Sequence, residues 1–147
     1  SEVAMAISSA EVVKETEMID QTHTFSARWE GAVPVCADVG LTKQALRILV
    51  DNSIKYTPAG GHITLSAALR DGMARLSVQD EGQGIDAGSL PHVFDRFFTS
   101  DKMRTGRNTG LGLAIVKALA GQMDCRAEAA LEGDMFAITL RWPVERR

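Results

Sequence analysis

Asp80 stands at the end of a row of alternating apolar residues and is followed by glycines. Ala74, Leu76 and Val78 recur at every second position, which is the period of a strand, so we expect Asp80 to share their inward-facing side. A carboxylate in that position needs hydrogen-bond donors, because burying it unpaired costs on the order of several kcal/mol. An exocyclic amine such as that of adenine is a suitable donor.

The residues after Asp80 favour a close approach of the backbone to a ligand. Gly82 and Gly84 allow the chain to turn sharply, and Ile85 is suited to press on a flat apolar ring. The alternative is an Asx-type turn after a strand, where Asp and Gly are common without any ligand. Taken alone, the segment leaves both interpretations open.

A second glycine-containing segment opens a later helical pattern. The run Thr109-Gly110-Leu111-Gly112-Leu113 predicts a helix N-terminus, where unpaired backbone N–H groups and the positive end of the helix dipole form a site for phosphate. The spacing matches neither the P-loop nor the dinucleotide-binding fingerprint. The alternative is an N-cap formed by Thr109, with the glycines present for tight packing.

The polar stretch 99–109 precedes this helix and contains the cations Lys102, Arg104 and Arg107. Its only large apolar residue is Met103, so the stretch cannot bury itself. A loop of this length is uncommon in a compact domain and is often functional, so we interpret it as a lid whose cations meet phosphate oxygens. A solvated basic loop is the alternative.

Asn52 lies near the end of an earlier helical pattern, one turn after Ile48, and shares a stripe with Lys55 and Tyr56. An amide oxygen there is suited to ligate Mg²⁺ while Lys55 meets a phosphate. Hard cations prefer oxygen ligands, and Mg²⁺ is usually shared between protein and phosphates. The alternative is a fraying helix end before Pro58.

An aromatic cluster is formed by Phe94, Phe97 and Phe98 in a chain with few aromatic residues. Core packing is the favoured role for these side chains. A hinge for the neighbouring lid is the second interpretation.

The elements that must position these residues follow from periodicity. Apolar residues at three- and four-residue spacing predict helices, period-two runs predict strands, and Asp71-Gly72 predicts a hairpin between two such runs. Hairpin-connected strands argue against an all-parallel sheet, so we expect a two-layer α/β sandwich, with a mixed, largely antiparallel sheet of about five strands covered on one face by about three helices. The expected helices cover 1–20, the region from Asp38 toward Tyr56, and 111–120; the expected strands cover 24–29, 63–69, 74–78, 125–131 and 135–142.

Length and composition indicate a single domain over residues 1–147. A chain of this length with 45% hydrophobic residues can bury one self-sufficient core, and a net charge of -3 gives no electrostatic case for nucleic acid or for an anionic membrane. Cys36 and Cys125 are too isolated for a zinc site or a disulfide framework, which favours a reducing cytoplasm. No run approaches the roughly 18 apolar residues of a membrane helix. The start without Met suggests a piece of a longer protein, and any membrane anchor of that protein would lie outside this segment.

Four segments match, in order, the pattern of sensor histidine kinases. Residues 44–58, ending in VDNSIKYTP, resemble the N box of that family, and VQDEGQGI at 78–85 resembles its first glycine box. VFDRFF at 93–98 is similar to the F box, and TGLGLAIV at 109–116 to the second glycine box. One box alone is a weak signal, but four in order with fitting spacers, over roughly residues 10–142, are highly specific.

The resemblance implies the Bergerat-type α/β sandwich shared with gyrase, Hsp90 and MutL ATPases. It also implies that Asp80 binds the adenine amine of ATP, that Asn52 binds Mg²⁺, and that Lys55, the lid cations and the backbone of 110–112 contact the phosphates. Asn52 and Lys55 are then the candidate catalytic residues. The full set of candidate nucleotide-binding residues is Asn52, Lys55, Tyr56, Asp80, Gly82, Gly84, Ile85, Lys102, Arg104, Thr109, Gly110, Leu111, Gly112 and Leu113.

Two positions depart from the family pattern. Ile48 stands where many members have an Asn and where gyrase-like ATPases have a Glu base, and Ile can neither accept a proton nor orient water. Efficient ATP hydrolysis of the gyrase kind is therefore not expected. Asn108 replaces a frequent glycine, which restricts the final turn of the lid.

None of the three histidines has the sequence context of a phosphoacceptor, which family members carry on a preceding helix. His23, His62 and His92 are followed by Thr, Ile and Val, respectively. We therefore expect the domain to bind Mg-ATP and present the γ-phosphate to a histidine on a separate dimerisation domain of its parent, with the response regulator reached indirectly. The isolated domain is expected to lack autophosphorylation.

Two other functions fit the same fold. Ile48 favours a pseudokinase, in which nucleotide occupancy only regulates docking. A serine kinase of the anti-sigma-factor type fits less well because of the aromatic segment 94–98 and the lid.

Overall fold

The computed structural model describes residues 4–29, 39–81, 87–96 and 112–143. Helices and strands appear where periodicity predicts them, with ends that differ by one or a few residues. The elements in chain order are α1 (Ala4–Ile19), β1 (Thr24–Trp29), α2 (Val39–Tyr56), β2 (His62–Arg70), β3 (Met73–Asp80), the 3-10 helix η1 (Ala87–His92), α3 (Gly112–Gln122), β4 (Arg126–Glu132) and β5 (Met135–Pro143).

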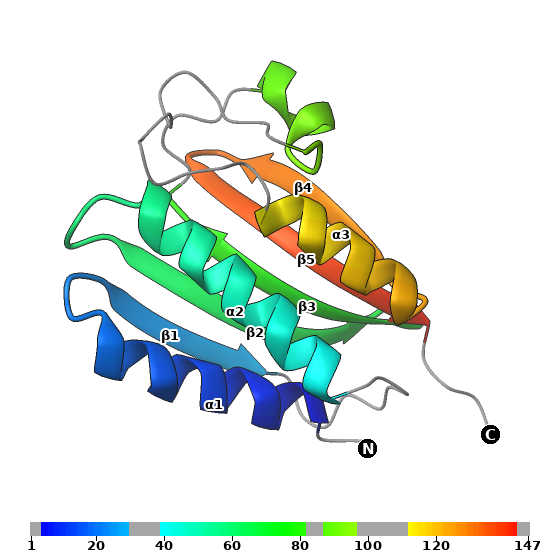
Figure 1. Ribbon diagram of the computed structural model, residues 1–147, viewed down its shortest axis with the longest axis horizontal. Coiled ribbons are helices and arrows are strands. Elements are labelled where there is room, and N and C mark those ends of the chain that lie inside the picture. Colours follow the sequence, from blue (N-terminus) through cyan, green and yellow to red (C-terminus); the bar gives the residue numbers. More distant parts are fainter. Residues whose placement is uncertain (1–3, 30–38, 82–86, 97–111, 144–147) are drawn as a thin grey trace.

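The five described strands form one mixed sheet in the order β1-β2-β3-β5-β4. β1 pairs with β2 in parallel, and α2 makes the crossover between them, whereas the other three pairings are antiparallel. Figure 1 shows the two hairpins side by side in the sheet, with β1 at one edge and β4 at the other. The expectation of a mixed, largely antiparallel sheet is confirmed.

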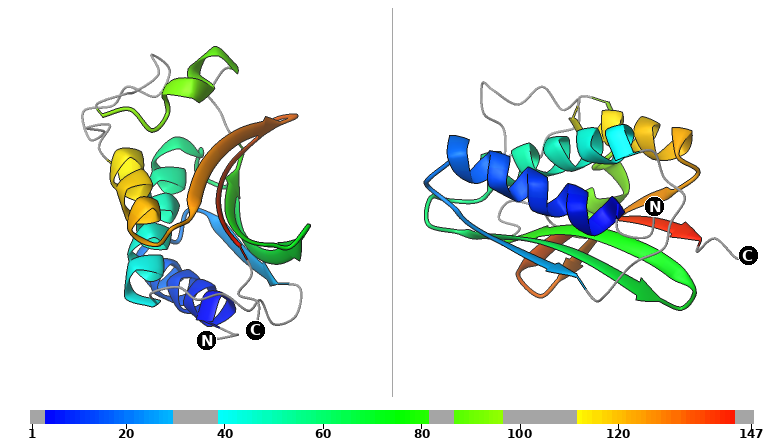
Figure 2. Two further views of the ribbon diagram at one scale, coloured as in Figure 1. Left: turned by 90° about the vertical axis from the view of Figure 1, so that its right-hand side faces the viewer. Right: turned by 90° about the horizontal axis from the view of Figure 1, so that it is seen from below.

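Helices α1, α2 and α3 all lie on one face of this sheet, which is seen edge-on in Figure 2. The core fills the space between the two layers because each layer contributes one apolar face. Leu46 and Leu49 on α2 are buried against the inward residues Ile63, Leu65 and Leu140 of the strands. The structure is the two-layer α/β sandwich expected from the sequence.

Turn residues adopt the backbone conformations that their types favour. Asp71 and Gly72, at the tip of the first hairpin, both have positive φ angles, 53° and 74°, as a two-residue primed turn requires. Gly60, with φ 87°, lies in the turn between α2 and β2.

Phe94 is partly buried and packs against the core, in agreement with the expected role of the aromatic cluster. Phe97 and Phe98 lie outside the described residues. None of the described helices is long and apolar enough to cross a membrane.

Candidate functional site

Asp80 is the last residue of β3 and continues a fully inward-facing row. Ala74, Leu76, Val78 and Asp80 are all buried, while their neighbours along the strand are partly exposed, so the predicted alternation is confirmed. Only 3% of Asp80 is exposed. The sequence therefore places a carboxylate at the end of the apolar layer, where the surrounding dielectric is low and any hydrogen bond it accepts is strengthened.

Helix α2 carries Asn52, Lys55 and Tyr56 in its last two turns. Asn52 is partly buried, and burial raises the pKa of the Tyr56 phenol. Lys55 Nζ forms an i,i+4 ion pair with Asp51 Oδ2 at 3.0 Å, in which 39% and 62% of the two side chains are exposed. An exposed pair of this kind contributes only about 0.3–0.5 kcal/mol, so a phosphate could readily draw Lys55 away from Asp51.

Ile48 and Gly112 bring α2 and the start of α3 together. A Cβ atom on Gly112 would lie 3.3 Å from Ile48 Cγ2, so only a residue without a side chain allows this approach with ease. Ile48 and Leu113 are partly buried and pack against the core. The departure from the family pattern at Ile48 therefore has a packing role, which was not predicted from the sequence.

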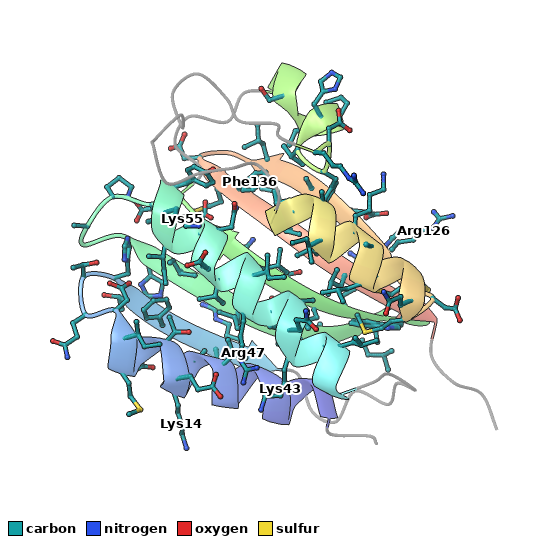
Figure 3. All side chains as sticks on the ribbon, in the orientation of Figure 1. Lys14, Lys43, Arg47, Lys55, Arg126 and Phe136 are labelled. Carbon is teal, nitrogen blue, oxygen red and sulfur yellow. The ribbon has the colours of Figure 1, made fainter. Side chains whose placement is uncertain are left out.

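These elements meet at one end of the molecule. Figure 3 shows Lys55 at the end of α2 and Phe136 on β5 at the same end, and Phe136 is the cross-strand partner of Asp80. The contact of Ile48 with Gly112 brings the start of α3 to α2 one turn before Asn52. The described candidates thus come from three elements that are separate in sequence and converge in space.

The other candidate residues lie outside the described residues, together with Arg107 and Asn108 of the expected lid. They are Gly82, Gly84, Ile85, Lys102, Arg104, Thr109, Gly110 and Leu111. Their assignment to the site stays a prediction.

The donor set of the described residues fits a shared rather than a protein-enclosed magnesium ion. In the described part of the chain, His, Cys, Asp and Glu side chains form no group of three that could hold a metal. A partly buried amide oxygen at Asn52 is compatible with Mg²⁺ because this ion usually takes one or two protein ligands and completes its shell with phosphate oxygens and water.

Sequence reasoning missed a set of contacts that joins the end of α2 to its surroundings. His23 contacts the backbone carbonyl of Thr57, two residues after Lys55, and Glu81 Oε1 accepts a hydrogen bond from the backbone N–H of His62 at 3.3 Å. Asp20 accepts a hydrogen bond from the backbone N–H of Thr22, which is an Asx turn after the end of α1, and Asp followed two residues later by Thr at a helix end is the sequence signal for such a turn.

Comparison with known proteins assigns the family. Residues 37–146 match the family described as histidine kinase-, DNA gyrase B-, and HSP90-like ATPase. Sensor histidine kinase WalK of Bacillus subtilis is 41% identical over 106 residues, which cover 68% of this chain and 17% of WalK. The sensor-like histidine kinase SenX3 of Mycolicibacterium smegmatis is 37% identical over 120 residues, covering 80% of this chain and 30% of SenX3. The chain thus spans less than a third of these relatives.

Solved structures show the same fold over nearly the whole chain. The mycobacterial sensor histidine kinase MprB superposes with a TM-score of 0.81 at 25% identity, covering 95% of both chains. Full-length ShkA in complex with AMPPNP gives a TM-score of 0.74 at 26% identity, covering 90% of this chain and 29% of ShkA. The structure of ThkA in complex with the response regulator TrrA gives a TM-score of 0.76 at 22% identity, covering 95% of this chain and 40% of ThkA.

The motif order and the five-stranded sandwich agree with these matches. The chain belongs to the histidine kinase-, DNA gyrase B- and HSP90-like ATPase family, as an ATP-binding catalytic domain of the sensor histidine kinase type.

Proposed function

We propose that this domain binds Mg-ATP and donates the γ-phosphate to a histidine on the dimerisation domain of a two-component sensor kinase. The observation that carries the proposal is Asp80, a carboxylate with 3% exposure at the end of an apolar row. The AMPPNP named with the related ShkA supports an adenine nucleotide as the ligand. The domain would act on the cytoplasmic side.

Asp80 would select adenine by hydrogen-bond polarity. An ionised carboxylate only accepts hydrogen bonds, and adenine offers the N–H donors of its exocyclic amine. Guanine has a carbonyl oxygen at the equivalent ring position, so a second acceptor would face the carboxylate. A buried acceptor discriminates between the bases because guanine would place a carbonyl oxygen, rather than an N–H donor, against it.

The phosphate end would rest on α2 and α3. Asn52 would hold Mg²⁺ through its amide oxygen, and Lys55 would leave Asp51 for a phosphate oxygen. Bound Mg²⁺ would supply neutralisation of the charge that develops during phosphoryl transfer. Gly112 and Leu113, with the preceding residues 109–111, would present backbone N–H groups to the phosphates. Positioning and charge neutralisation are the whole catalytic contribution of this chain in the proposal.

The phosphoacceptor would come from outside the domain. His23 has both ring nitrogens in hydrogen bonds, and 5% of its side chain is exposed, so it is not available as a nucleophile. His62 contacts Ser26 at the sheet surface, and His92, the last residue of η1, pairs with Asp95. The response regulator would take the phosphoryl group from the dimerisation domain, and the ThkA complex with TrrA supports such a partner.

The test replaces Asp80 with Asn and measures binding of a non-hydrolysable ATP analogue by calorimetry. Asp80→Asn keeps the size of the side chain but replaces the carboxylate, which in the proposal accepts a hydrogen bond from the adenine amine, with a neutral amide. We expect the affinity to fall about tenfold or more, because a hydrogen bond to a charged group contributes roughly 1.5–3 kcal/mol.

Asp71→Asn is the matched control. Asp71 is exposed at the hairpin tip with φ 53°, a conformation that Asn also tolerates, so this variant should bind like the wild type. Unchanged affinity in Asp80→Asn, with the variant folded, would contradict the adenine assignment.

A second candidate function is a nucleotide-binding module that does not transfer phosphate. Ile48 favours it, because an apolar side chain packed near Gly112 replaces a residue that many family members use near the metal. Incubation of the domain with a phosphoacceptor-domain fragment and labelled ATP separates the two candidates. Acid-labile phosphohistidine on the fragment supports the kinase, and its absence despite tight nucleotide binding supports the module.

A further inference from the structure

His23 joins two segments that are far apart in sequence. It lies between α1 and β1, and 5% of its side chain is exposed. His23 Nδ1 lies 2.6 Å from Asp20 Oδ2, and His23 Nε2 lies 2.7 Å from the backbone carbonyl oxygen of Thr57, 34 residues away. The ring therefore links the α1–β1 turn to the residue that follows α2.

The two partners of His23 determine its protonation state. A carboxylate and a backbone carbonyl only accept hydrogen bonds, so both ring nitrogens must carry a proton to satisfy them. A neutral ring has one N–H and would lose one of the two contacts. Thr22 Oγ1, 3.0 Å from Nδ1, could then donate to the bare nitrogen, but it is also 2.6 Å from Asp20 Oδ1.

The surroundings favour the protonated ring. Burial lowers the pKa of His23, but the hydrogen bonds to Thr57 and Asp20 and the negative charges of Asp20 and Glu81 outweigh it, so the pKa is raised above its ordinary value. The Phe25 ring on β1 lies beside it, with centroids 6.4 Å apart. The groups that face the imidazole thus come from the α1–β1 turn, β1, the end of α2 and the end of β3.

The same corner is tied to the segments that carry the candidate site. Backbone hydrogen bonds join Gly60 N–H to the Thr22 carbonyl at 2.6 Å and Thr24 N–H to the Gly61 carbonyl at 3.0 Å. Glu81, which directly follows Asp80, accepts a hydrogen bond from the backbone N–H of His62, the residue after Gly61. The α1–β1 turn is therefore hydrogen-bonded to the connection between α2 and β2, and the residue after that connection, His62, is in turn hydrogen-bonded to Glu81.

We propose that His23 is a positioning residue of the nucleotide site, which as an imidazolium holds the last two turns of α2, with Asn52 and Lys55, in register with Asp80. The inference rests on the proposed nucleotide function. Because the hydrogen bond to Asp20 or Thr57 is lost when the ring is deprotonated, affinity for Mg-ATP is highest below the pKa of His23 and falls as the pH rises through it. In this proposal His23 acts through its contacts with Asp20 and Thr57 rather than on the nucleotide itself.

The experiment measures the dissociation constant of a non-hydrolysable Mg-ATP analogue between pH 6 and 9 for the wild type, His23→Gln and His62→Gln. We expect the affinity of the wild type to fall about three- to tenfold across the titration of His23, the equivalent of one hydrogen bond. His23→Gln should bind the analogue weakly even at low pH, and its affinity should not show the fall with pH that is expected of the wild type. Ionisation of the nucleotide itself is common to all three proteins and cancels in their ratios.

His62→Gln is the matched control, since His62 is exposed and its ring contacts only Ser26 among the described residues. It should keep the wild-type pH profile. Identical profiles in His23→Gln and His62→Gln would overturn the inference. Failure of the wild type to bind nucleotide at any pH would overturn the proposed function as well, so the two failures are distinguishable.

Two further measurements cover the case in which His23→Gln does not fold. Asp20→Asn keeps an acceptor but removes the negative charge, so the affinity step should move to lower pH. In the wild type, the ring C–H signals of His23 can be followed by NMR as the pH is changed, with and without saturating nucleotide. Nucleotide should raise the pH midpoint of this titration by the logarithm of the fold-change in affinity, because protonation and nucleotide binding affect each other equally. A midpoint that moves no more than those of His62 and His92 would also overturn the inference.

Discussion

Ile48 has a structural role, because its side chain packs against the core and next to Gly112. On α2 it lies one turn before Asn52, at a position where the resemblance to sensor histidine kinases leads us to expect a polar side chain. Its Cγ2 atom would be 3.3 Å from a Cβ on Gly112, so the branched side chain fills the space between α2 and the start of α3. The sequence revealed the loss of a polar group, and the fold revealed the packing contact.

Cys125 is predicted to be an unreactive thiol. Burial, and secondarily the charge of Asp124, raise its pKa to about 11. At pH 8 its thiolate fraction should therefore be roughly two orders of magnitude below that of an ordinary cysteine, and alkylation should slow accordingly. The measurement is iodoacetamide labelling at pH 8, followed by mass spectrometry of the peptide that contains Cys125.

Labelling in urea gives the reference rate for Cys125, because unfolding exposes the thiol. Peptide-level detection separates Cys125 from Cys36, which lies outside the described residues. Equal rates in the folded and unfolded protein would show that the thiol is not shielded as described.

At the scale of elements, the turn from α2 to β2 is closely packed: of the described glycines, Gly61 in this turn has the least space for an added Cβ atom. A Cβ on Gly61 would lie 2.3 Å from Thr57 Cγ2 and 2.9 Å from the Pro58 carbonyl oxygen, and Gly61 also accepts the hydrogen bond from Thr24 that begins the β1–β2 pairing. This turn therefore couples the end of the proposed site helix to the parallel edge of the sheet.

Gly61→Ala should destabilise the domain by about 1–3 kcal/mol, because the added methyl group overlaps backbone and side-chain atoms that cannot both move aside. Gly121→Ala is the matched control. Gly121 lies in α3 with no atom within 4 Å of an added Cβ, so Ala should leave the stability unchanged or raise it by up to about 1 kcal/mol.

Urea unfolding followed by circular dichroism gives both free energies. Equal effects of the two substitutions would mean that the turn has room to relax. A loss confined to Gly61→Ala would confirm the close packing at Thr57.

At the scale of the whole molecule, one layer of helices covers the sheet, and the other face of the sheet is polar. Ser77 and Thr139 share a hydrogen bond of 2.8 Å there, and Arg141 donates to Glu128 at 2.6 Å. The large buried apolar side chains of the described strands, such as Leu65, Leu76 and Leu140, belong to the core on the helical side, at whose end Asp80 lies. A ligand seated at that end would contact both layers and would stabilise the fold as a unit.

Mg-ATP should accordingly raise the melting temperature. A ligand at a hundred times its dissociation constant adds about 2.7 kcal/mol, which for a domain of this size corresponds to roughly 5–10 °C. Differential scanning fluorimetry checks this value. Mg-GTP at the same concentration should give a much smaller shift, and EDTA should reduce the shift with ATP.

A shift of equal size with GTP would contradict adenine recognition by Asp80. A shift with ATP that EDTA leaves unchanged would contradict the magnesium site at Asn52.

The sequence alone determined those features that depend on neighbouring residues. The inward position of Asp80 follows from the period-two row of β3, and the positive φ angles at Asp71 and Gly72 follow from the turn types these residues favour. Helix and strand positions were predictable for the same reason, since periodicity is a property of consecutive side chains. The ordered motifs also placed the candidate residues on α2, at the end of β3 and at the start of α3, and their roles stay a prediction.

Tertiary structure alone decided which distant residues meet. The parallel pairing of β1 with β2, the approach of Ile48 to Gly112, and the link from His23 to Thr57 join segments whose separation in sequence carries no periodic signal. Such contacts depend on how two layers pack around a shared core, where crossing angles and side-chain volumes of many residues act together. The buried position of Asp80 was therefore a property of the sequence, whereas the environment that holds α2 beside it is a property of the fold.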